Sequence, residues 1–258
     1  MIRTYGRKRK KCRPAIGILI LSGILALQVF LTLYFIRRFS DYNSPAPTPS
    51  SVAAAAPVRG EDDKKIDAQW LVLVNLDNPT SNQRPENLVQ LDQIFGEEVA
   101  LVNGSGYIQK DAAKAAKQMF LDAEKQNIGP YKITSAYRSV EYQEELFQAK
   151  LAENPDYGKN PYQNPVKVLP GNCSEHTTGL ALDILSVAYE QSDDGYGETP
   201  EGQWLTAHAH EYGFVLRYPR QKEHLTGVIY EPWHYRFVGV QAATEIYEKD
   251  LCLEEYLN

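Results

Sequence analysis

The sequence predicts an α+β fold, a small antiparallel sheet flanked by helices. Segments with helical periodicity lie early and late in the globular part of the chain, and short apolar segments typical of strands lie between them. Strands and helices do not alternate regularly, which argues against a repeating βαβ sheet. With 258 residues the chain is long enough for one domain with a sizeable core and additional segments.

The first 65 residues differ in composition from the rest and predict three segments. Residues 1–14 are basic. Residues 15–36 carry no charge over 22 positions, and such a helix would be about 33 Å long, enough for the roughly 30 Å hydrocarbon core of a bilayer. Because a cleaved signal peptide has a shorter apolar region, we expect a retained transmembrane helix. Residues 37–65 are rich in Pro, Ala, Ser and Asp and predict a flexible linker to a globular domain at 66–258.

Charge is distributed unevenly along the chain. Nine basic residues and no acidic residue lie within 1–38, and seven of the nine precede the apolar segment. The positive-inside rule therefore predicts a single-pass protein of the cell membrane, with its N-terminus in the cytoplasm and the globular domain outside. The rest of the chain has 18 basic and 33 acidic residues, a formal charge of −15. Such an acidic domain is a poor candidate for binding nucleic acid, which requires neutralisation of phosphates.

The first half of the globular domain predicts two strands and two helices. Residues 70–74 form an apolar run that predicts a buried strand. An apolar stripe predicts a helix over 110–127, with Gly129 as its stop. Residues 131–136 alternate as a strand, and Ser139 can cap a helix that runs to about residue 152.

The second half predicts the remaining strands. Prolines and asparagines make 154–171 a loop, and an apolar run predicts a buried strand over 179–187. The further elements are an acidic loop at 189–199, a helix from Pro200 to Gly213, strands at 214–218 and 233–238, and helical sequence over about 240–257.

Two short segments hold a set of side chains suited to metal-dependent hydrolysis. A catalytic zinc needs three protein ligands drawn from His and Asp or Glu, an open position for water, and a carboxylate that takes the proton of that water. His176, Asp183 and His234 could be the ligands, and Glu231 the base. Asp183 lies in an apolar run, where a charged side chain is costly unless it is paired or bound to a metal.

Glu231 and three further histidines also allow ordinary structural roles. Glu231 could be a solvated turn residue, although its closeness to a candidate ligand favours a role in the site. His208 and His210 lie on a predicted helix outside any ligand pattern, and His224 lies in a polar turn. These three histidines are expected to be structural or solvated.

The cysteines leave one question open. Cys12 is predicted to be cytoplasmic, so it cannot pair with the other two. Cys173 and Cys252 are predicted to lie outside, where a disulfide can persist, but their spacing does not show whether they pair. Cys173 could also be read as a ligand three residues before His176, but the hydrolytic set is complete without it.

Two segments resemble the two zinc motifs of the VanY-like D-alanyl-D-alanine carboxypeptidases, which have the hedgehog/D,D-peptidase fold. They are residues 170–184, PGNCSEHTTGLALDI, and residues 227–236, GVIYEPWHYR. The resemblance extends from about Ile66 to the C-terminus, since supporting segments also match the family. These are VNLDNP at 74–79, SAYRS at 135–139 with Gln143, and YGFVLRYP at 212–219.

The resemblance implies a role for each site residue. It implies that His176, Asp183 and His234 hold Zn²⁺ and that Glu231 is the general base, which later protonates the leaving amine. It further implies that Arg138 grips the carbonyl or carboxylate of the substrate. Gln143 and Ser174 would then be further polar contacts to it. A guanidinium suits this task because its fork of donors matches an anionic end group or a developing oxyanion.

The expected function is a membrane-anchored zinc D,D-carboxypeptidase that hydrolyses the terminal D-Ala-D-Ala bond of peptidoglycan stem peptides or their precursors. An alternative is an L,D-carboxypeptidase or an endopeptidase acting on the same stems, because the same metal set serves all three. A second alternative is a non-catalytic domain that binds wall peptides. The presence of Glu231 argues against it, because a binding domain has no need of a base.

Overall fold

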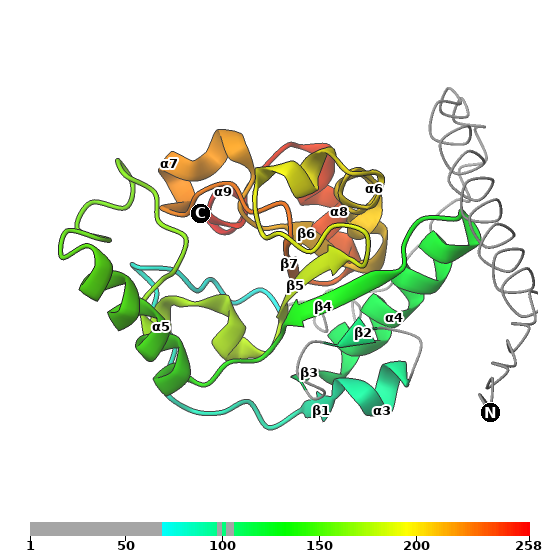
Figure 1. Ribbon diagram of the computed structural model, residues 1–258, viewed down its shortest axis with the longest axis horizontal. Coiled ribbons are helices and arrows are strands. Elements are labelled where there is room, and N and C mark those ends of the chain that lie inside the picture. The colour runs from blue at the N-terminus through cyan, green and yellow to red at the C-terminus, as the bar shows by residue number, and fades with distance from the viewer. Residues whose placement is uncertain (1–68, 97–99, 102–105) are drawn as a thin grey trace, which may run out of the picture. The chain divides into compact units, whose positions relative to one another are not determined.

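A computed structural model describes residues 69–96, 100–101 and 106–258 of the chain (Figure 1). The predicted cytoplasmic segment, transmembrane helix and linker lie outside these residues, as does Cys12. Within the described ranges, no helix combines the length and the apolar character needed to cross a bilayer.

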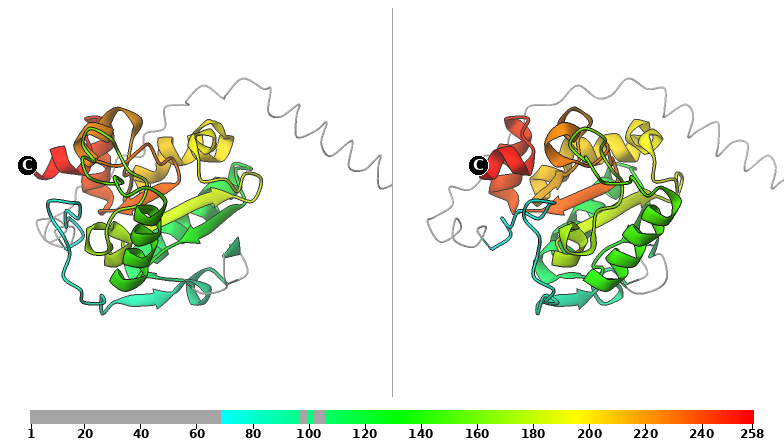
Figure 2. Two further views of the ribbon diagram at one scale, coloured as in Figure 1. Left: turned by 60° about the vertical axis from the view of Figure 1, so that its left-hand side comes forward. Right: turned by 90° about the vertical axis from the view of Figure 1, so that its left-hand side faces the viewer.

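The centre of the domain is a five-stranded sheet with the strand order β2-β4-β5-β7-β6. The pair β2 and β4 is parallel, and every other pair in this sheet is antiparallel. The α+β prediction with a small antiparallel sheet is therefore confirmed, with one parallel pair at the edge. Figures 1 and 2 show β4, β5 and β7 side by side. The strands are β2 (Ala100–Leu101), β4 (Tyr131–Ser135), β5 (Ala181–Ser186), β6 (Phe214–Leu216) and β7 (His234–Phe237).

A second sheet was not predicted from the sequence. It consists of β1 (Leu88–Gln90) and β3 (Tyr107–Gln109), which pair antiparallel. The short helix α3 (Leu91–Phe95) follows β1 directly. Each of these strands has only three residues, too few to show a clear alternation of apolar and polar positions.

Two of the helices, α5 and α6, begin at side-chain caps that the sequence supplies. Helix α5 begins after Ser139, whose hydroxyl accepts a hydrogen bond from the backbone N–H of Tyr142. Helix α6 begins at Pro200 after Thr199, whose hydroxyl accepts from the N–H of Gly202. The α-helices after α3 are α4 (Lys110–Lys125), α5 (Val140–Glu153), α6 (Pro200–His208), α7 (Glu223–Thr226), α8 (Val240–Glu248) and α9 (Leu253–Leu257).

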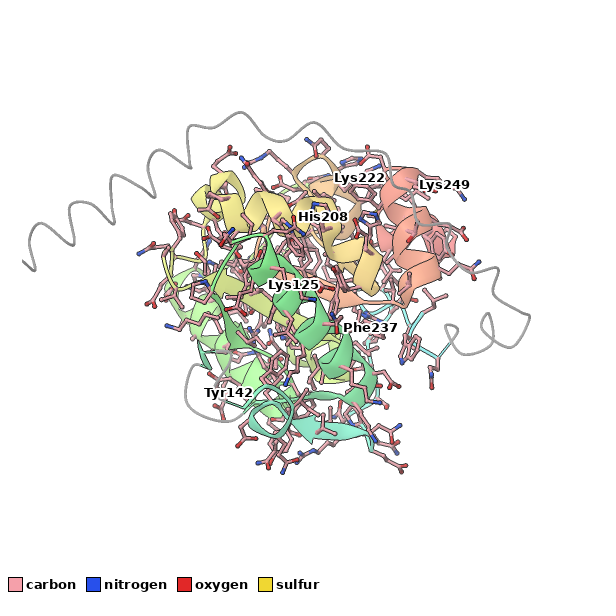
Figure 3. The ribbon with its side chains drawn as sticks, turned by 90° about the vertical axis from the view of Figure 1, so that its right-hand side faces the viewer. Lys125, Tyr142, His208, Lys222, Phe237 and Lys249 are labelled. Carbon is pink, nitrogen blue, oxygen red and sulfur yellow. The ribbon has the colours of Figure 1, made fainter. Side chains whose placement is uncertain are left out.

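One face of the large sheet is packed against helices, and the other carries the candidate site. One face packs against α4 and α6, which Figure 3 shows on the same side, with Lys125 and His208 marking them. The ring of Phe120 stacks on Tyr131 of β4, with centroids 4.9 Å apart, and the Tyr131 hydroxyl donates to a carbonyl oxygen of α6. Because side chains alternate along a strand, Asp183 points to the opposite face. The candidate site is thus built on a sheet whose other side is packed core.

The prediction of a strand at residues 70–74 was wrong. These residues are irregular, and the structure assigns them no strand partner. The Arg236 guanidinium donates to the carbonyl oxygens of Trp70 and Val72 at 2.9 and 2.7 Å, and the Trp70 ring packs edge-on against Phe237. A buried side chain thus binds backbone acceptors that a neighbouring strand would otherwise bind.

Two predicted helix ends differ from the structure. Helix α4 stops at Lys125, and Asn127 adopts the left-handed conformation with a φ of 61° two residues before Gly129. Asn tolerates this conformation better than most residues, so it ends the helix earlier. The helix predicted from Pro200 to Gly213 is divided into α6 and a 3₁₀ turn at Ala209–Tyr212, with Gly213 as the left-handed stop.

Candidate active site

The pairing of β5 with β7 brings two of the predicted ligands together. Asp183 and His234 lie directly opposite each other in this antiparallel pair, and Ser135 of β4 lies opposite Asp183 on its other side. Directly opposite residues of an antiparallel pair point to the same face of the sheet. The Nδ1 atom of His234 accordingly lies 3.0 Å from Oδ1 of Asp183.

The third ligand comes from a 3₁₀ turn that precedes β5. His176 lies in η2 (Glu175–Thr178), which ends at Gly179 with a φ of 67°. Its Nδ1–H donates to the carbonyl oxygen of Ala136 at 2.6 Å, so the lone pair is left on Nε2. This Nε2 atom lies 3.3 Å from Oδ1 of Asp183.

The three side chains fit a zinc ion. One ligand atom from each of His176, Asp183 and His234 can be chosen so that all lie within 4.8 Å of one another, and all three residues are buried. In a tetrahedral zinc site with bonds of about 2.0–2.1 Å, the ligand atoms are about 3.3 Å apart. The 3.3 and 3.0 Å separations of the two histidine nitrogens from Oδ1 of Asp183 are close to that value, and all the ligand atoms lie within 4.8 Å of one another. Two imidazoles and a carboxylate leave a fourth position open, as in a catalytic zinc site.

The fourth predicted residue, Glu231, lies beside this cluster. Its backbone N–H donates to the carbonyl oxygen of Tyr218, and its Oε2 lies 3.9 Å from Nδ1 of His234. Burial raises the pKa of Glu231 to about 8; His234 opposes the rise, and the charge of Asp183 adds to it. A carboxyl with a pKa near neutral is suited to both taking and returning a proton.

The two histidines differ in their electrostatic environment. Burial, together with the positive charge of Arg138, lowers the pKa of His176 to about 4, so its ring is neutral at pH 7. Burial also acts to lower the pKa of His234, but the neighbouring carboxylates of Asp183 and Glu175 outweigh it and raise this pKa to about 9. The carboxyl pKa of Asp183 is well below its usual range: burial raises it, and the two histidines and Arg138 lower it by more.

The predicted substrate residue Arg138 contacts the metal-ligand cluster directly. Its Nη2 donates to Oδ2 of Asp183 at 2.8 Å, its Nη1 to Oε1 of Gln143 at 2.9 Å, and its Nε to the hydroxyl of Ser135 at 2.8 Å. The Gln143 amide nitrogen donates to the carbonyl oxygen of Leu169. Gln143 therefore uses both ends of its amide to hold Arg138 and the loop, and Arg138 fixes the orientation of Asp183.

All seven predicted site residues line one open cleft of about 380 Å³. Ser174 is the seventh, and it is buried at the start of η2. One wall of the cleft is made by α5, and the other includes Lys167, whose Nζ lies 4.6 Å from the ring centre of Trp233. The α5 wall consists of Leu146, Ala149, Lys150 and Glu153.

The remaining histidines lie outside this cleft, as expected. His208 pairs with Glu211 at the surface, His210 stacks on Tyr247, and His224 is exposed. Cys173 and Cys252 are buried free thiols, so no disulfide joins them in the described residues. Cys173 is not part of the metal-ligand cluster.

A buried ionic cluster behind His234 was not predicted. Glu175, Arg217 and Arg236 are almost completely inaccessible to solvent, and Glu254 of α9 joins them. Two members of this cluster could have been noticed in the sequence. Arg217 and Arg236 are charged residues within apolar strand segments, as Asp183 is. Glu175 lies next to His176 in a loop, where a charge is ordinary and draws no attention.

Comparison with known proteins agrees with the fold and the site. Residues 105–240 match the family model VanY, D-alanyl-D-alanine carboxypeptidase. A D-alanyl-D-alanine carboxypeptidase of Enterococcus faecalis is 39% identical over 74% of this chain and 66% of its own length. VanXYC of Enterococcus gallinarum, a bifunctional D-Ala-D-Ala dipeptidase and carboxypeptidase, is 31% identical over 72% of this chain and 92% of its own. The chain thus spans about two thirds of the first relative and most of the second.

Solved structures give the same result. The LdcB LD-carboxypeptidase superposes with a TM-score of 0.63 and 34% identity, over 72% of this chain and 84% of its own. VanYB in complex with D-alanine-D-alanine gives 0.60 and 33%, over 74% and 98%. A VanY mutant in complex with Zn(II) gives 0.57 and 34%, over 73% and 99%. These matches identify the class of protein as a carboxypeptidase, and the His-Asp-His set beside the buried carboxyl of Glu231 agrees with that class. The chain belongs to the VanY D-alanyl-D-alanine carboxypeptidase family.

Proposed function

We propose that the chain is a zinc D,D-carboxypeptidase that removes the terminal D-alanine from peptidoglycan stem peptides ending in D-Ala-D-Ala. The observation that supports it best is the convergence of three ligand atoms within 4.8 Å, in the same cleft as the buried carboxyl of Glu231. A domain that only binds peptides has no need of a base with a pKa near 8. The related VanYB has been solved with D-alanine-D-alanine bound, which supports the choice of substrate.

The residues divide the reaction among them. Nε2 of His176, the Asp183 carboxylate and Nδ1 of His234 would hold zinc, which when bound polarises a carbonyl and lowers the pKa of its water to about 7. Glu231 takes the proton of the attacking water and returns it to the leaving amine of D-alanine. Arg138 binds the substrate carbonyl or carboxylate with the edge of its guanidinium that faces the cleft, and Gln143 keeps that guanidinium in place. Ser174 offers a further polar contact.

An L,D-carboxypeptidase acting on tetrapeptide stems is the second candidate. It is favoured by the similarity to the LdcB LD-carboxypeptidase, which has a TM-score of 0.63. Both reactions need the same metal set and base, so the shape of the cleft beyond Arg138 decides between them.

Mass spectrometry of products from defined stems tests both candidates. The zinc-loaded protein is incubated with a pentapeptide ending in D-Ala-D-Ala and, separately, with the tetrapeptide that lacks the last residue. The D,D-activity predicts loss of one D-alanine from the pentapeptide and no reaction of the tetrapeptide, with both unreactive after chelation. Release of D-alanine from the tetrapeptide alone would establish the L,D-activity instead. No release from either stem would contradict the enzymatic proposal.

We further propose that residues 15–36 anchor the chain in the cell membrane as a single span, with the catalytic domain at the outer surface facing the wall. The support is the uncharged 22-residue length and the seven basic residues before it. The full chain is expected to remain in the membrane fraction after alkaline extraction, and its domain should be digested by protease added outside intact protoplasts. A chain that is released by alkali, or protected from that protease, would contradict the anchor or its orientation.

A further inference from the structure

Glu175 occupies the centre of the buried cluster behind the metal ligands. Its side chain is 0% exposed, and its Oε1 accepts hydrogen bonds from Nε of Arg217 and Nη1 of Arg236, both at 2.7 Å. Because Oε1 accepts from two guanidiniums, it can act only as an acceptor, and the carboxylate is held in one orientation. The orientation of the second oxygen, Oε2, is therefore set by these two arginines.

Within the part of the chain that the structure describes, two buried polar atoms in this region have no hydrogen-bond partner, and they face each other. They are Oε2 of Glu175 and Nε2 of His234, which are 3.7 Å apart. Buried polar atoms are rarely left unpaired, so such a pair needs an explanation. A movement of less than about 1 Å would bring them to hydrogen-bond distance.

The opposite edge of the same imidazole points into the site. Nδ1 of His234 faces Oδ1 of Asp183, another member of the ligand cluster. A neutral imidazole that offers its lone pair at Nδ1 must carry its proton on Nε2. His176 shows the complementary arrangement, since its Nδ1–H donates to Ala136 and its Nε2 faces the cluster.

From these contacts we infer that Glu175 is a positioning residue that accepts a hydrogen bond from Nε2–H of His234 and so presents Nδ1 to the metal. The inference rests on the proposed zinc site. It goes beyond the metal ligands themselves. It proposes that Glu175, which contacts no substrate, determines which ring nitrogen of His234 carries the proton. Carboxylate partners of metal-bound histidines fix ring orientation and tautomer in this way in other zinc sites.

The C-terminal helix completes the arrangement. Glu254 of α9 accepts from both terminal nitrogens of Arg217, at 2.8 and 2.6 Å, and Asn75 donates to Glu254 at 3.2 Å. Arg217 is thereby shared between Glu254 and Glu175. The orientation of His234 therefore depends, through two ion pairs, on a helix at the end of the chain.

The substitution Glu175→Gln tests the inference because it changes hydrogen-bond roles while keeping shape. The two guanidiniums require the amide oxygen of Gln on their side, which turns its NH₂ group toward Nε2 of His234. Nε2 must then accept, the proton moves to Nδ1, and the metal-binding lone pair is lost. Removal of such a partner typically weakens metal binding about 10–100-fold, and we expect a zinc affinity lower by that factor.

The zinc dissociation constant is measured by competition with a chromophoric chelator, and the tautomer of His234 by ¹⁵N NMR of the zinc-loaded protein. Glu254→Gln should shift the dissociation constant in the same direction by a smaller factor. The matched control is Glu255→Gln, on the same helix, which loses an ion pair to Lys222 that does not lead to the site. Thermal unfolding of the metal-free variants separates lost stability from lost affinity.

Several outcomes decide the matter. A wild-type His234 with its proton on Nε2, together with weaker zinc binding in Glu175→Gln but not in Glu255→Gln, supports the inference. It is overturned if zinc-loaded His234 carries its proton on Nδ1, or if a folded Glu175→Gln binds zinc as tightly as the wild type. If Glu175→Gln does not fold, the wild-type tautomer and Glu254→Gln still decide. A wild-type protein that binds no zinc would instead refute the proposed function.

Discussion

Asp183 and His234 lie directly opposite each other on β5 and β7, and the strand pairing alone brings Oδ1 of one to 3.0 Å from Nδ1 of the other. These two residues are 51 positions apart in the chain. The backbone hydrogen bonds of a central antiparallel pair fix their relative position, so two of the three proposed ligands are preorganised by the sheet itself. His176 comes from the 3₁₀ turn η2, and Glu231 lies just before β7.

Glu231→Gln should separate catalysis from metal binding. The amide keeps the size of the side chain and cannot take a proton, so kcat should fall by at least about 10²–10⁴-fold. KM should change little, because substrate binding is assigned to Arg138, Gln143 and Ser174. Zinc content and kcat are measured side by side, with His234→Ala as the comparison that should lose both. Near-normal kcat, or loss of zinc from Glu231→Gln, would show that Glu231 is not the base.

Removal of zinc should abolish activity and leave the fold largely intact. The three ligands lie at one surface of a core whose residues, such as Leu182 and Ile184, are fully buried by protein contacts. A three-ligand catalytic site on such a core is not needed for folding. Circular dichroism before and after chelation provides the measurement, and added zinc should restore activity. Global unfolding on chelation would mean that the metal is structural.

Arg138→Lys should reduce kcat by about 10²-fold at saturating zinc, because a single ammonium cannot reproduce the guanidinium fork that serves both the substrate and Asp183. Arg220→Lys is the matched control, since Arg220 forms an exposed ion pair with Asp194. Steady-state kinetics and zinc titrations are compared. If the loss of activity is restored completely by raising the zinc concentration, then Arg138 acts only through Asp183 and the assigned substrate contact is wrong.

In the metal-free protein, the contribution of Glu231 to the free energy of unfolding should fall as pH rises. Burial raises the pKa of this carboxyl from 4.5 to about 8, so the folded state holds its proton more tightly than the unfolded chain. The resulting stabilisation is fully present below pH 4.5 and is lost as pH rises through 8. Between these values the free energy of unfolding, relative to Glu231→Gln, should fall by up to about 1.4 kcal/mol per pH unit.

Chemical denaturation of the chelated proteins at several pH values checks this difference. Glu255→Gln is the control, because hydrogen bonding to Lys222 lowers the pKa of Glu255 and its contribution is therefore complete above pH 5. Parallel stability curves for the wild type and Glu231→Gln between pH 5 and 8 would show that the carboxyl of Glu231 is ionised in the folded protein throughout.

Where local chemistry decides structure, the sequence was sufficient. Ser139 caps α5 as predicted because its hydroxyl needs only the N–H three residues ahead. Asp183 was identified as a site residue because a carboxylate in an apolar run is costly wherever the strand lies. These are properties of a few consecutive residues, so they can be read without knowing the fold. The two segments that resemble the family's motifs, at residues 170–184 and 227–236, are likewise local and can be recognised without the fold.

Only the tertiary structure decided what depends on distant partners. The apolar run at residues 70–74 predicted a strand, but Arg236, 166 positions away from Trp70, binds the backbone acceptors there. Glu175 looked like an ordinary loop residue, and it became the buried partner of Arg217 and Arg236 once β6 and β7 had paired. Burial of these charges is costly, and their attraction offsets that cost only where opposite charges meet. Which charges meet depends on the fold, so no local segment of the sequence specifies it.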